Sequence, residues 1–170
     1  GGPMAGVVRE LAAVPDADVR AMATYLVSFQ PDVDEQAASA QAQRAIAAAA
    51  SNEGRLLGPA QRMFDGACAA CHHDGNGPTL LGVNAPLALN SNLTSARPDN
   101  LLRTILGGVR EPALRDIGFM PAFRDALDDA QIAELAGYMR ARFAPQEPPW
   151  SDLPQSVARV RATSAAATAR

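Results

Sequence analysis

One short motif constrains this chain of 170 residues more than any other feature: Cys68-Ala69-Ala70-Cys71-His72. Its cysteines are the only 2 in the sequence, and a histidine directly follows the second one. C-x-x-C-H is the spacing by which haem is attached to a polypeptide through thioether bonds. The histidine can then reach the iron as its proximal ligand. The rest of the chain is therefore expected to enclose a covalent haem.

Other interpretations of a C-x-x-C pair are weaker in this sequence. A four-thiolate zinc site is excluded because there is no further cysteine. Zinc could still be bound by the thiolates together with His72 and His73, but adjacent histidines do not form the usual separated ligand pairs. A redox disulfide of the thioredoxin kind would lie among alternating strands and helices, and the sequence around Cys68 has no such pattern.

A second iron ligand is predicted at Met120. Among the 5 methionines, Met22, Met63 and Met139 fall within helical apolar patterns, which favours a role in the core. Met120 instead lies in the segment 118–123, where glycine and proline prevent a regular helix and allow the thioether to project inward. A histidine and a methionine would fill both axial positions and raise the reduction potential, so that the iron would pass electrons and bind little else.

Periodicity predicts helices and no strand. Aspartates open three amphipathic segments, at 16–29, 99–106 and 128–143, and each of them is followed by proline or glycine. Branched residues are sparse and do not alternate. Phe64 lies four residues before Cys68, so it shares a helix face with that cysteine and can pack against the closing helix. The sequence therefore predicts an all-α fold.

The order of these motifs resembles that of class I c-type cytochromes over residues 59–145. That family has a helix, C-x-x-C-H, a G-P-x-L-x-G loop, a middle helix, a Met-Pro loop and a closing helix. This sequence has the corresponding parts in the same order, at 60–66, 68–72, 77–82, 98–106, 120–121 and 128–143. The resemblance implies a class I cytochrome c fold around one haem c.

The resemblance also assigns roles to individual residues. It implies thioethers at Cys68 and Cys71, with His72 and Met120 as the iron ligands. It further implies that the Pro78 carbonyl accepts a hydrogen bond from Nδ1 of His72, which would orient the ring and strengthen it as a donor. Leu135 and Tyr138 are the closing-helix residues expected opposite the aromatic ring before the motif.

A partial repeat predicts how the chain is divided. Residues 15–26 parallel 127–139, with an acidic start and a late tyrosine, and a proline next to a methionine precedes each segment. We therefore expect a remnant of a preceding cytochrome domain at 1–31, with Met4 in the ligand position. An Ala-rich linker at 32–58, the haem domain at 59–147 and a tail at 148–170 would follow. A second haem is expected only if the missing part of the first domain is present. The alternative is an unrelated amphipathic helix.

Composition and resemblance together limit the function. The net charge is −3 and the charges are scattered, which indicates no nucleic-acid surface. No apolar run approaches the roughly 20 residues needed to span a bilayer. Resemblance implies a periplasmic location, with the export signal lost with the missing front part and membrane association through that part or through partners. The Pro148-Pro149-Trp150 segment resembles the region after the third haem domain in cytochrome subunits of molybdenum hydroxylases for nicotinate or isoquinoline.

These observations predict an electron-transfer domain rather than an enzyme by itself. We expect the C-terminal haem domain of a multihaem cytochrome subunit. It would pass single electrons from a molybdenum hydroxylase, or from a flavin alcohol or sugar dehydrogenase, to quinone or an oxidase. One alternative is a haem enzyme or a sensor of gas or peroxide with an open iron site, for which Arg115 and Arg124 are the nearby candidates. Another is a structural adaptor in which haem chiefly stabilises the fold.

Overall fold

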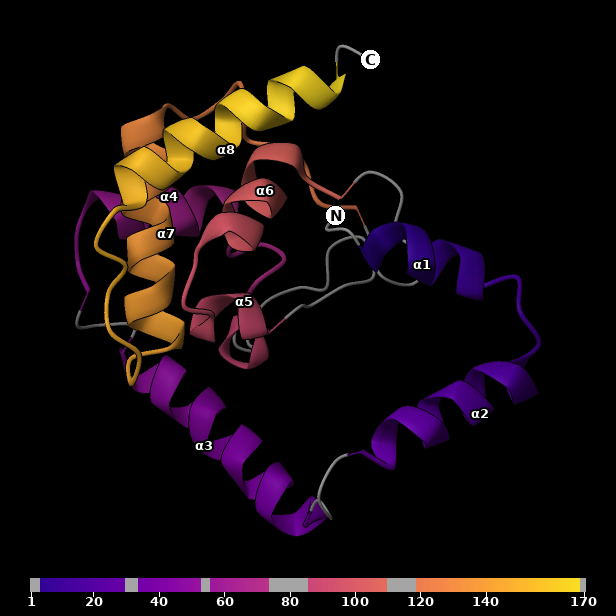
Figure 1. The fold of residues 1–170 in the computed structure, drawn as a ribbon. Coiled ribbons are helices and arrows are strands. Elements are labelled where there is room, and N and C mark those ends of the chain that lie inside the picture. Colours follow the sequence, from indigo (N-terminus) through magenta and orange to yellow (C-terminus); the bar gives the residue numbers. More distant parts are fainter. Residues whose placement is uncertain (1–3, 30–33, 53–55, 74–85, 110–118, 169–170) are drawn as a thin grey trace.

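The computed structural model describes residues 4–29, 34–52, 56–73, 86–109 and 119–168, and within these ranges the regular structure is helical (Figure 1). In chain order the elements are α1 (Met4–Leu11), α2 (Asp16–Val27), α3 (Glu35–Asn52), α4 (Pro59–Ala67), η3 (Leu87–Leu89), α5 (Ser91–Thr94), α6 (Asp99–Gly107), α7 (Asp129–Phe143) and α8 (Leu153–Thr168). Extended pairing in the described residues is limited to an isolated antiparallel bridge between Val109 and Met120. The predicted all-α class is confirmed.

Local signals explain where the helices of the haem region begin. Pro59 stands in the first turn of α4, where its missing N–H removes no helical hydrogen bond. Asp128 caps α7 by accepting a hydrogen bond of 2.8 Å from the Gln131 backbone N–H, and the Gln131 side chain accepts one of 2.9 Å from the Asp128 N–H. This reciprocal capping box fixes the start of α7, much of which is buried. The helices predicted before the motif, after Pro98 and after Asp128 are all present.

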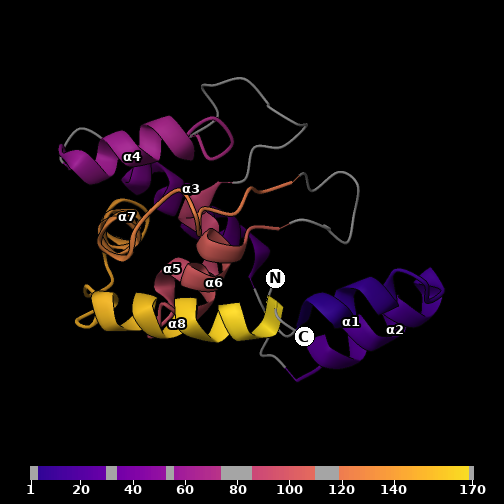
Figure 2. The same cartoon turned by 90° about the horizontal axis from the view of Figure 1, so that it is seen from above.

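The core is shared by α4 to α8, and α4 crosses α7 on one side of it (Figure 2). Phe64 is completely buried, and its ring centre lies 5.6 Å from that of Tyr138 and 5.5 Å from that of Phe143. Leu135 is also buried, as predicted for the closing helix. Burial of a side chain the size of phenylalanine contributes on the order of 3 kcal/mol. Because Phe64 stands one helical turn before Cys68, this crossing fixes the end of α4 from which the cysteine motif follows.

Residues 148–170, for which composition predicts only a tail, contain the helix α8. It packs along α6 and α7, and Val157 and Val160 are buried in the shared core. The Arg161 guanidinium also donates a hydrogen bond of 2.9 Å to the Leu127 carbonyl at the start of α7. The sequence pattern is weak because few apolar side chains lie among alanines and polar residues. The helix is nevertheless part of the domain.

The expected spacer also packs on the domain. Its alanine content predicts a helix, and α3 is one, but its C-terminal turns contact α7. Ala49 is fully buried there, and the Asn52 amide donates a hydrogen bond of 3.4 Å to the Ala141 carbonyl. Alanine's small side chain allows this close approach between helices.

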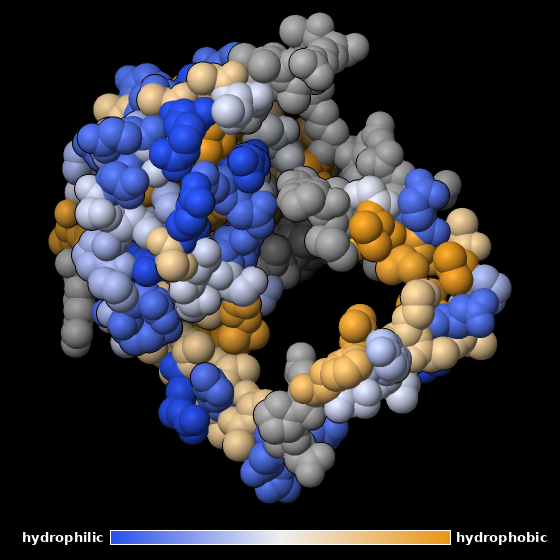
Figure 3. All heavy atoms as spheres, viewed as in Figure 1, coloured by the Kyte–Doolittle hydropathy of each residue, from blue (hydrophilic) through white to orange (hydrophobic). Residues whose placement is uncertain are grey.

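By contrast, α2 has no buried residue, although its apolar residues fall on one face. Figure 3 shows apolar surface gathered on α1 and α2. Tyr25 is 65% exposed and Phe29 is 69% exposed. Met22, predicted to lie in a core, is also exposed, whereas Met139 is buried as expected. In the described part of the chain, no helix combines the length and apolar character required to cross a bilayer.

Candidate haem site

The C-x-x-C-H motif forms one tight turn at the end of α4. Cys68 is the residue that ends the helix, and its carbonyl accepts hydrogen bonds from the N–H of Cys71 at 3.1 Å and of His72 at 2.9 Å. Residues three and four apart in such a turn lie on one side of the backbone. Both cysteines are half-buried free thiols, and His72 is half-buried beside them. The turn therefore presents two thiols and an imidazole within five residues.

The surroundings of Cys68 disfavour a charged sulfur. Burial raises the pKa of its thiol to about 11, and repulsion from Cys71 acts in the same direction. The thiol is consequently neutral at physiological pH. Covalent attachment converts the thiol into a thioether, which carries no charge and so incurs no such penalty on burial. The chemistry of this site thus fits covalent haem attachment.

Met120 is held by its backbone at the end of α6. Its N–H donates to the Val109 carbonyl at 3.1 Å, and its carbonyl accepts from the Val109 N–H at 2.9 Å. Successive side chains of extended backbone point to opposite sides. Accordingly Phe119 is 51% exposed, whereas Met120 is half-buried. Met120 is therefore partly shielded from solvent. It lies outside the helices of the described residues, as the sequence predicts.

Other predicted residues have different outcomes. Pro78 and Arg115 lie outside the described residues. Arg124, a candidate for chemistry at an open iron site, instead donates a hydrogen bond of 3.2 Å to the Arg161 carbonyl in α8. The pairing of Val109 with Met120 was not predicted, because a single backbone bridge has no repeating side-chain pattern. Its one sequence signal is the glycine pair at 107–108, which predicted only the end of a helix.

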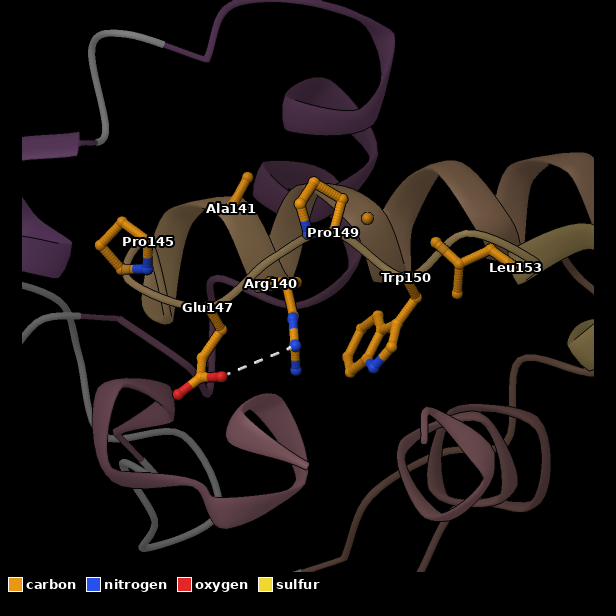
Figure 4. Close-up of a pocket in the computed structure, with 8 residues that line it drawn as sticks. Arg140, Ala141, Pro145, Glu147, Pro149, Trp150 and Leu153 are labelled. Carbon is orange, nitrogen blue, oxygen red and sulfur yellow. Dashed lines mark ion pairs between the residues drawn. The ribbon is translucent and has the colours of Figure 1, made fainter. Parts of the chain in front are cut away.

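A separate pocket lies between α7 and the segment that leads into α8 (Figure 4). Its lining includes Arg140, Pro145, Trp150 and Leu153, and the Arg140 guanidinium lies 3.9 Å from the Glu147 carboxylate. None of the residues predicted to bind haem lines this pocket. It is the space left where a proline-rich segment crosses the end of α7.

Comparisons with known proteins agree with the geometry. Residues 57–139 match the family model described as cytochrome c oxidase, cbb3-type, subunit III. A nicotinate dehydrogenase subunit of Pseudomonas putida is 48% identical over 161 residues, which are 95% of this chain and 13% of that protein. The fructose dehydrogenase cytochrome subunit of Gluconobacter japonicus is 30% identical over 84% of this chain and 33% of its own length. Cytochrome c6 of Leptolyngbya boryana is 32% identical over 46% of this chain and 82% of its own length.

The chain thus spans only 13% and 33% of the two dehydrogenase subunits, but it contains most of cytochrome c6. The matched region includes the crossing of α4 and α7, the cysteine turn and the Met120 loop. These relatives do not favour the alternative of a haem enzyme or sensor with an open iron site. With Cys68 and Cys71 as its one pair of thiols for haem c, the chain belongs to the cytochrome c family of electron-transfer proteins.

Proposed function

We propose that this domain relays single electrons from a partner dehydrogenase to the respiratory chain, with His72 and Met120 as the two axial ligands of its haem iron. The observation that carries the proposal is the fixed, half-buried position of Met120 in a family whose haem is attached by the C-x-x-C-H turn. A soft thioether opposite an imidazole favours reduced iron and leaves no coordination position for a substrate.

Each residue of the site then has a distinct task. Cys68 and Cys71 form the thioethers, and His72 donates its imidazole to the iron. Pro78 has no N–H, and its carbonyl is proposed to accept the Nδ1 proton of His72, which sets the tautomer and the plane of the ring. Met120 supplies the second ligand. When bound, the haem supplies a one-electron iron couple. The chain's own residues anchor it, orient it and exclude competing ligands.

The relatives support a dehydrogenase as the electron donor. Similarity to the nicotinate dehydrogenase subunit covers 95% of this chain at 48% identity, compared with 84% at 30% for the fructose dehydrogenase subunit. We therefore favour a hydroxylase of the molybdenum type over a flavin sugar dehydrogenase as the partner. Quinone or an oxidase would accept the electrons. The proposed location is the periplasm, with membrane association through the partner or through another part of the full-length protein.

The exposed apolar face of α2 supports the proposed division of the chain. Tyr25, Leu26 and Phe29 are exposed here. In a complete domain, a helix face with such large apolar side chains is normally buried against another element. We propose that residues 1–31 are the closing part of a separate cytochrome domain of a multihaem subunit, joined through 32–58 to the haem domain at 59–147. The segment 148–170 then completes the haem domain through α8.

Substitution of the ligand tests the central proposal. Met120→Ala should abolish the ferric charge-transfer band of the iron–thioether bond, lower the midpoint potential, and allow cyanide to bind readily. Met63→Leu is the matched control, because Met63 is also half-buried but lies within α4. It should retain the band and the potential. An unchanged band and potential in the Met120 variant would defeat the ligand assignment.

A second experiment tests the electron donor. The purified haem protein is mixed anaerobically with a nicotinate hydroxylase and its substrate, and haem reduction is followed optically. Reduction should depend on both hydroxylase and substrate. A sugar dehydrogenase of the flavin type serves as the comparison. Faster reduction by the flavin enzyme would overturn the proposed partner while leaving the axial ligands unaffected.

A further inference from the structure

We propose that the Gly108-Val109 turn positions Met120 for the iron, and that Gly108 is indispensable because no larger residue fits there. The inference rests on the proposed role of Met120 as axial ligand. It adds two positioning residues, on a different segment of the chain, that set where the sulfur lies. Neither residue is itself proposed to touch the iron.

Gly108 makes the turn possible through its backbone conformation. It follows the last residue of α6 and has φ +66°, in the left-handed region that favours glycine. Its N–H donates to the Thr104 carbonyl at 2.9 Å and so closes the last turn of the helix. The chain then leaves the helix axis in a direction that brings Val109 alongside Met120.

Backbone hydrogen bonds tie the Met120 loop to this turn. Both polar backbone groups of Met120 bond to Val109, at 2.9 and 3.1 Å. A third bond of 3.0 Å runs from the Phe123 N–H to the Ile105 carbonyl, one turn earlier in α6. Because Ile105 is buried in the core, this bond attaches the loop to a helix whose position is fixed by packing. These bonds use only backbone atoms of Met120, so they fix the residue without engaging its sulfur.

The packing at Gly108 is too close for any side chain. A Cβ built there would lie 2.8 Å from the Ala122 nitrogen and 2.8 Å from the Pro121 carbonyl carbon, and it would approach the Met120 carbonyl oxygen more closely still. All three obstacles are backbone atoms, which cannot rotate away as a side chain can. The neighbouring Gly107 has nothing within 4 Å of its own Cβ position. The requirement for glycine is therefore specific to position 108.

An alanine at position 108 must consequently push the Met120 loop away from α6. The loop carries the sulfur with it, and a metal–ligand bond tolerates little displacement. We expect Gly108→Ala to lose most of the ferric iron–thioether band, to lower the midpoint potential toward that of Met120→Ala, and to bind cyanide more tightly than the unaltered protein.

Gly107→Ala is the control in the haem-loaded full chain. It adds the same methyl group one residue earlier in open space, and it should leave the band, the potential and the cyanide affinity unchanged. Urea unfolding is measured for both variants. A merely structural role for Gly108 would lower the unfolding midpoint and leave the spectrum and potential intact.

The outcomes separate the two proposals. If Met120→Ala loses the band but a folded Gly108→Ala keeps both band and potential, the positioning role is wrong and the ligand assignment stands. If Met120→Ala keeps the band, the proposed function fails, and this inference fails with it. If Gly108→Ala does not accumulate as a haem protein, Val109→Pro serves as the second test of the positioning role. It removes the N–H that donates to the Met120 carbonyl and also restricts the backbone at positions 108 and 109, so the iron–thioether band should be lost. An unaltered spectrum in that variant would overturn the inference.

Discussion

At the scale of single residues, a buried arginine organises the surroundings of the haem domain's closing helix. Arg140 is 4% exposed and donates to the carbonyls of Leu93 at 2.7 Å, Ser95 at 2.8 Å and Pro148 at 2.9 Å. Its guanidinium also lies 4.2 Å from the ring centre of Trp150. A buried charge is tolerated when its donors are satisfied, and the planar guanidinium can serve several carbonyls at once. Arg140 therefore joins α5, α7 and the segment before α8.

Removal of this arginine should strongly destabilise the domain. Arg140→Met keeps the length of the side chain but leaves the carbonyls of Leu93 and Pro148 without this donor, whereas the Ser95 carbonyl keeps the hydrogen bond of 3.0 Å from the Trp150 indole. The loss should lower the free energy of unfolding by about 3 kcal/mol. Arg140→Lys should recover only part of the loss, because an ammonium cannot reproduce the fork geometry. Urea unfolding of the haem-loaded protein measures both. Arg103→Met, at an exposed position of α6, should change stability by less than about 0.5 kcal/mol.

The residues expected to bind haem could be identified from the sequence, but the burial and the partners of Arg140 could not. The cysteine turn and the aromatic ring of Phe64 follow from spacing, since both depend on neighbours along one helix. Arg140 instead bonds to carbonyls more than 40 residues away in sequence, and charged residues usually face solvent. The hydrogen bonds between Met120 and Val109 could not be predicted from the sequence for the same reason. Backbone partners distant in sequence leave no residue-type signal.

At the scale of elements, α8 shows how few apolar side chains can suffice to dock a helix. Val157 and Val160 lie three residues apart and are both buried, whereas much of the helix surface is alanine or polar. Polar contacts at its sides add specificity, among them an Arg159–Asp99 ion pair of 3.2 Å that joins α8 to the first turn of α6. Weak periodicity concealed this helix in the sequence. For α7, the aspartates at its start and the larger apolar residues Ile132, Leu135 and Met139 predicted its position correctly.

Shortening one of these valines tests whether α8 is integral to the domain. Val157→Ala should lower the free energy of unfolding by about 2 kcal/mol, because it removes two buried methyl groups and leaves a cavity. Ala158→Ser at the adjacent exposed position should cost no more than about 0.5 kcal/mol, the difference in helix propensity. Thermal unfolding followed by helical circular dichroism compares the two. Equal stability in both variants would mean that α8 is not docked in solution.

The attachment of α8 to α6 should also depend on pH. Partial burial alone would raise the pKa of Asp99, but hydrogen bonds and charge attraction from Arg97 and Arg159 outweigh it and hold the pKa below its ordinary value of 3.8. A carboxyl with a lowered folded-state pKa stabilises the fold above the unfolded-state value and loses that contribution as the pH falls through the folded-state value. Stability should therefore decrease in the acid range below pH 3.8.

Asp99→Asn isolates this contribution. Near neutral pH the variant should be less stable by about 1 kcal/mol, the size expected for a partly exposed ion pair at a helix N-terminus. Below the titration range the two proteins should converge in stability, since both then carry a neutral side chain at position 99. Urea midpoints measured across this range provide the comparison. A stability difference that stays constant with pH would show that the charge of Asp99 is not responsible.

At the scale of the whole molecule, the described chain contains two unlike parts. The closely packed helix pairs involve α3 to α8 together with η3, and α1 and α2 are not among them. The region from α3 to α8 buries aromatic rings and branched side chains, whereas the N-terminal part exposes Tyr25 and Phe29. The helical class and the order of the cytochrome elements could be predicted because they depend on local periodicity. The packing of α3 and α8 could not, because alanine-rich helices carry little information about which face is buried.

Deletion of residues 1–31 distinguishes a separate domain from a part of this one. If α1 and α2 belong to another cytochrome domain, the remaining chain should keep its haem spectrum, and its free energy of unfolding should change by less than about 0.5 kcal/mol. Deletion of 148–170 is the contrasting variant. It removes Val157, Val160 and Trp150 from the core and should prevent stable folding. A large loss of stability on removing 1–31 would instead place α1 and α2 within the haem domain, and the repeat between 15–26 and 127–139 would then reflect only two similar amphipathic helices.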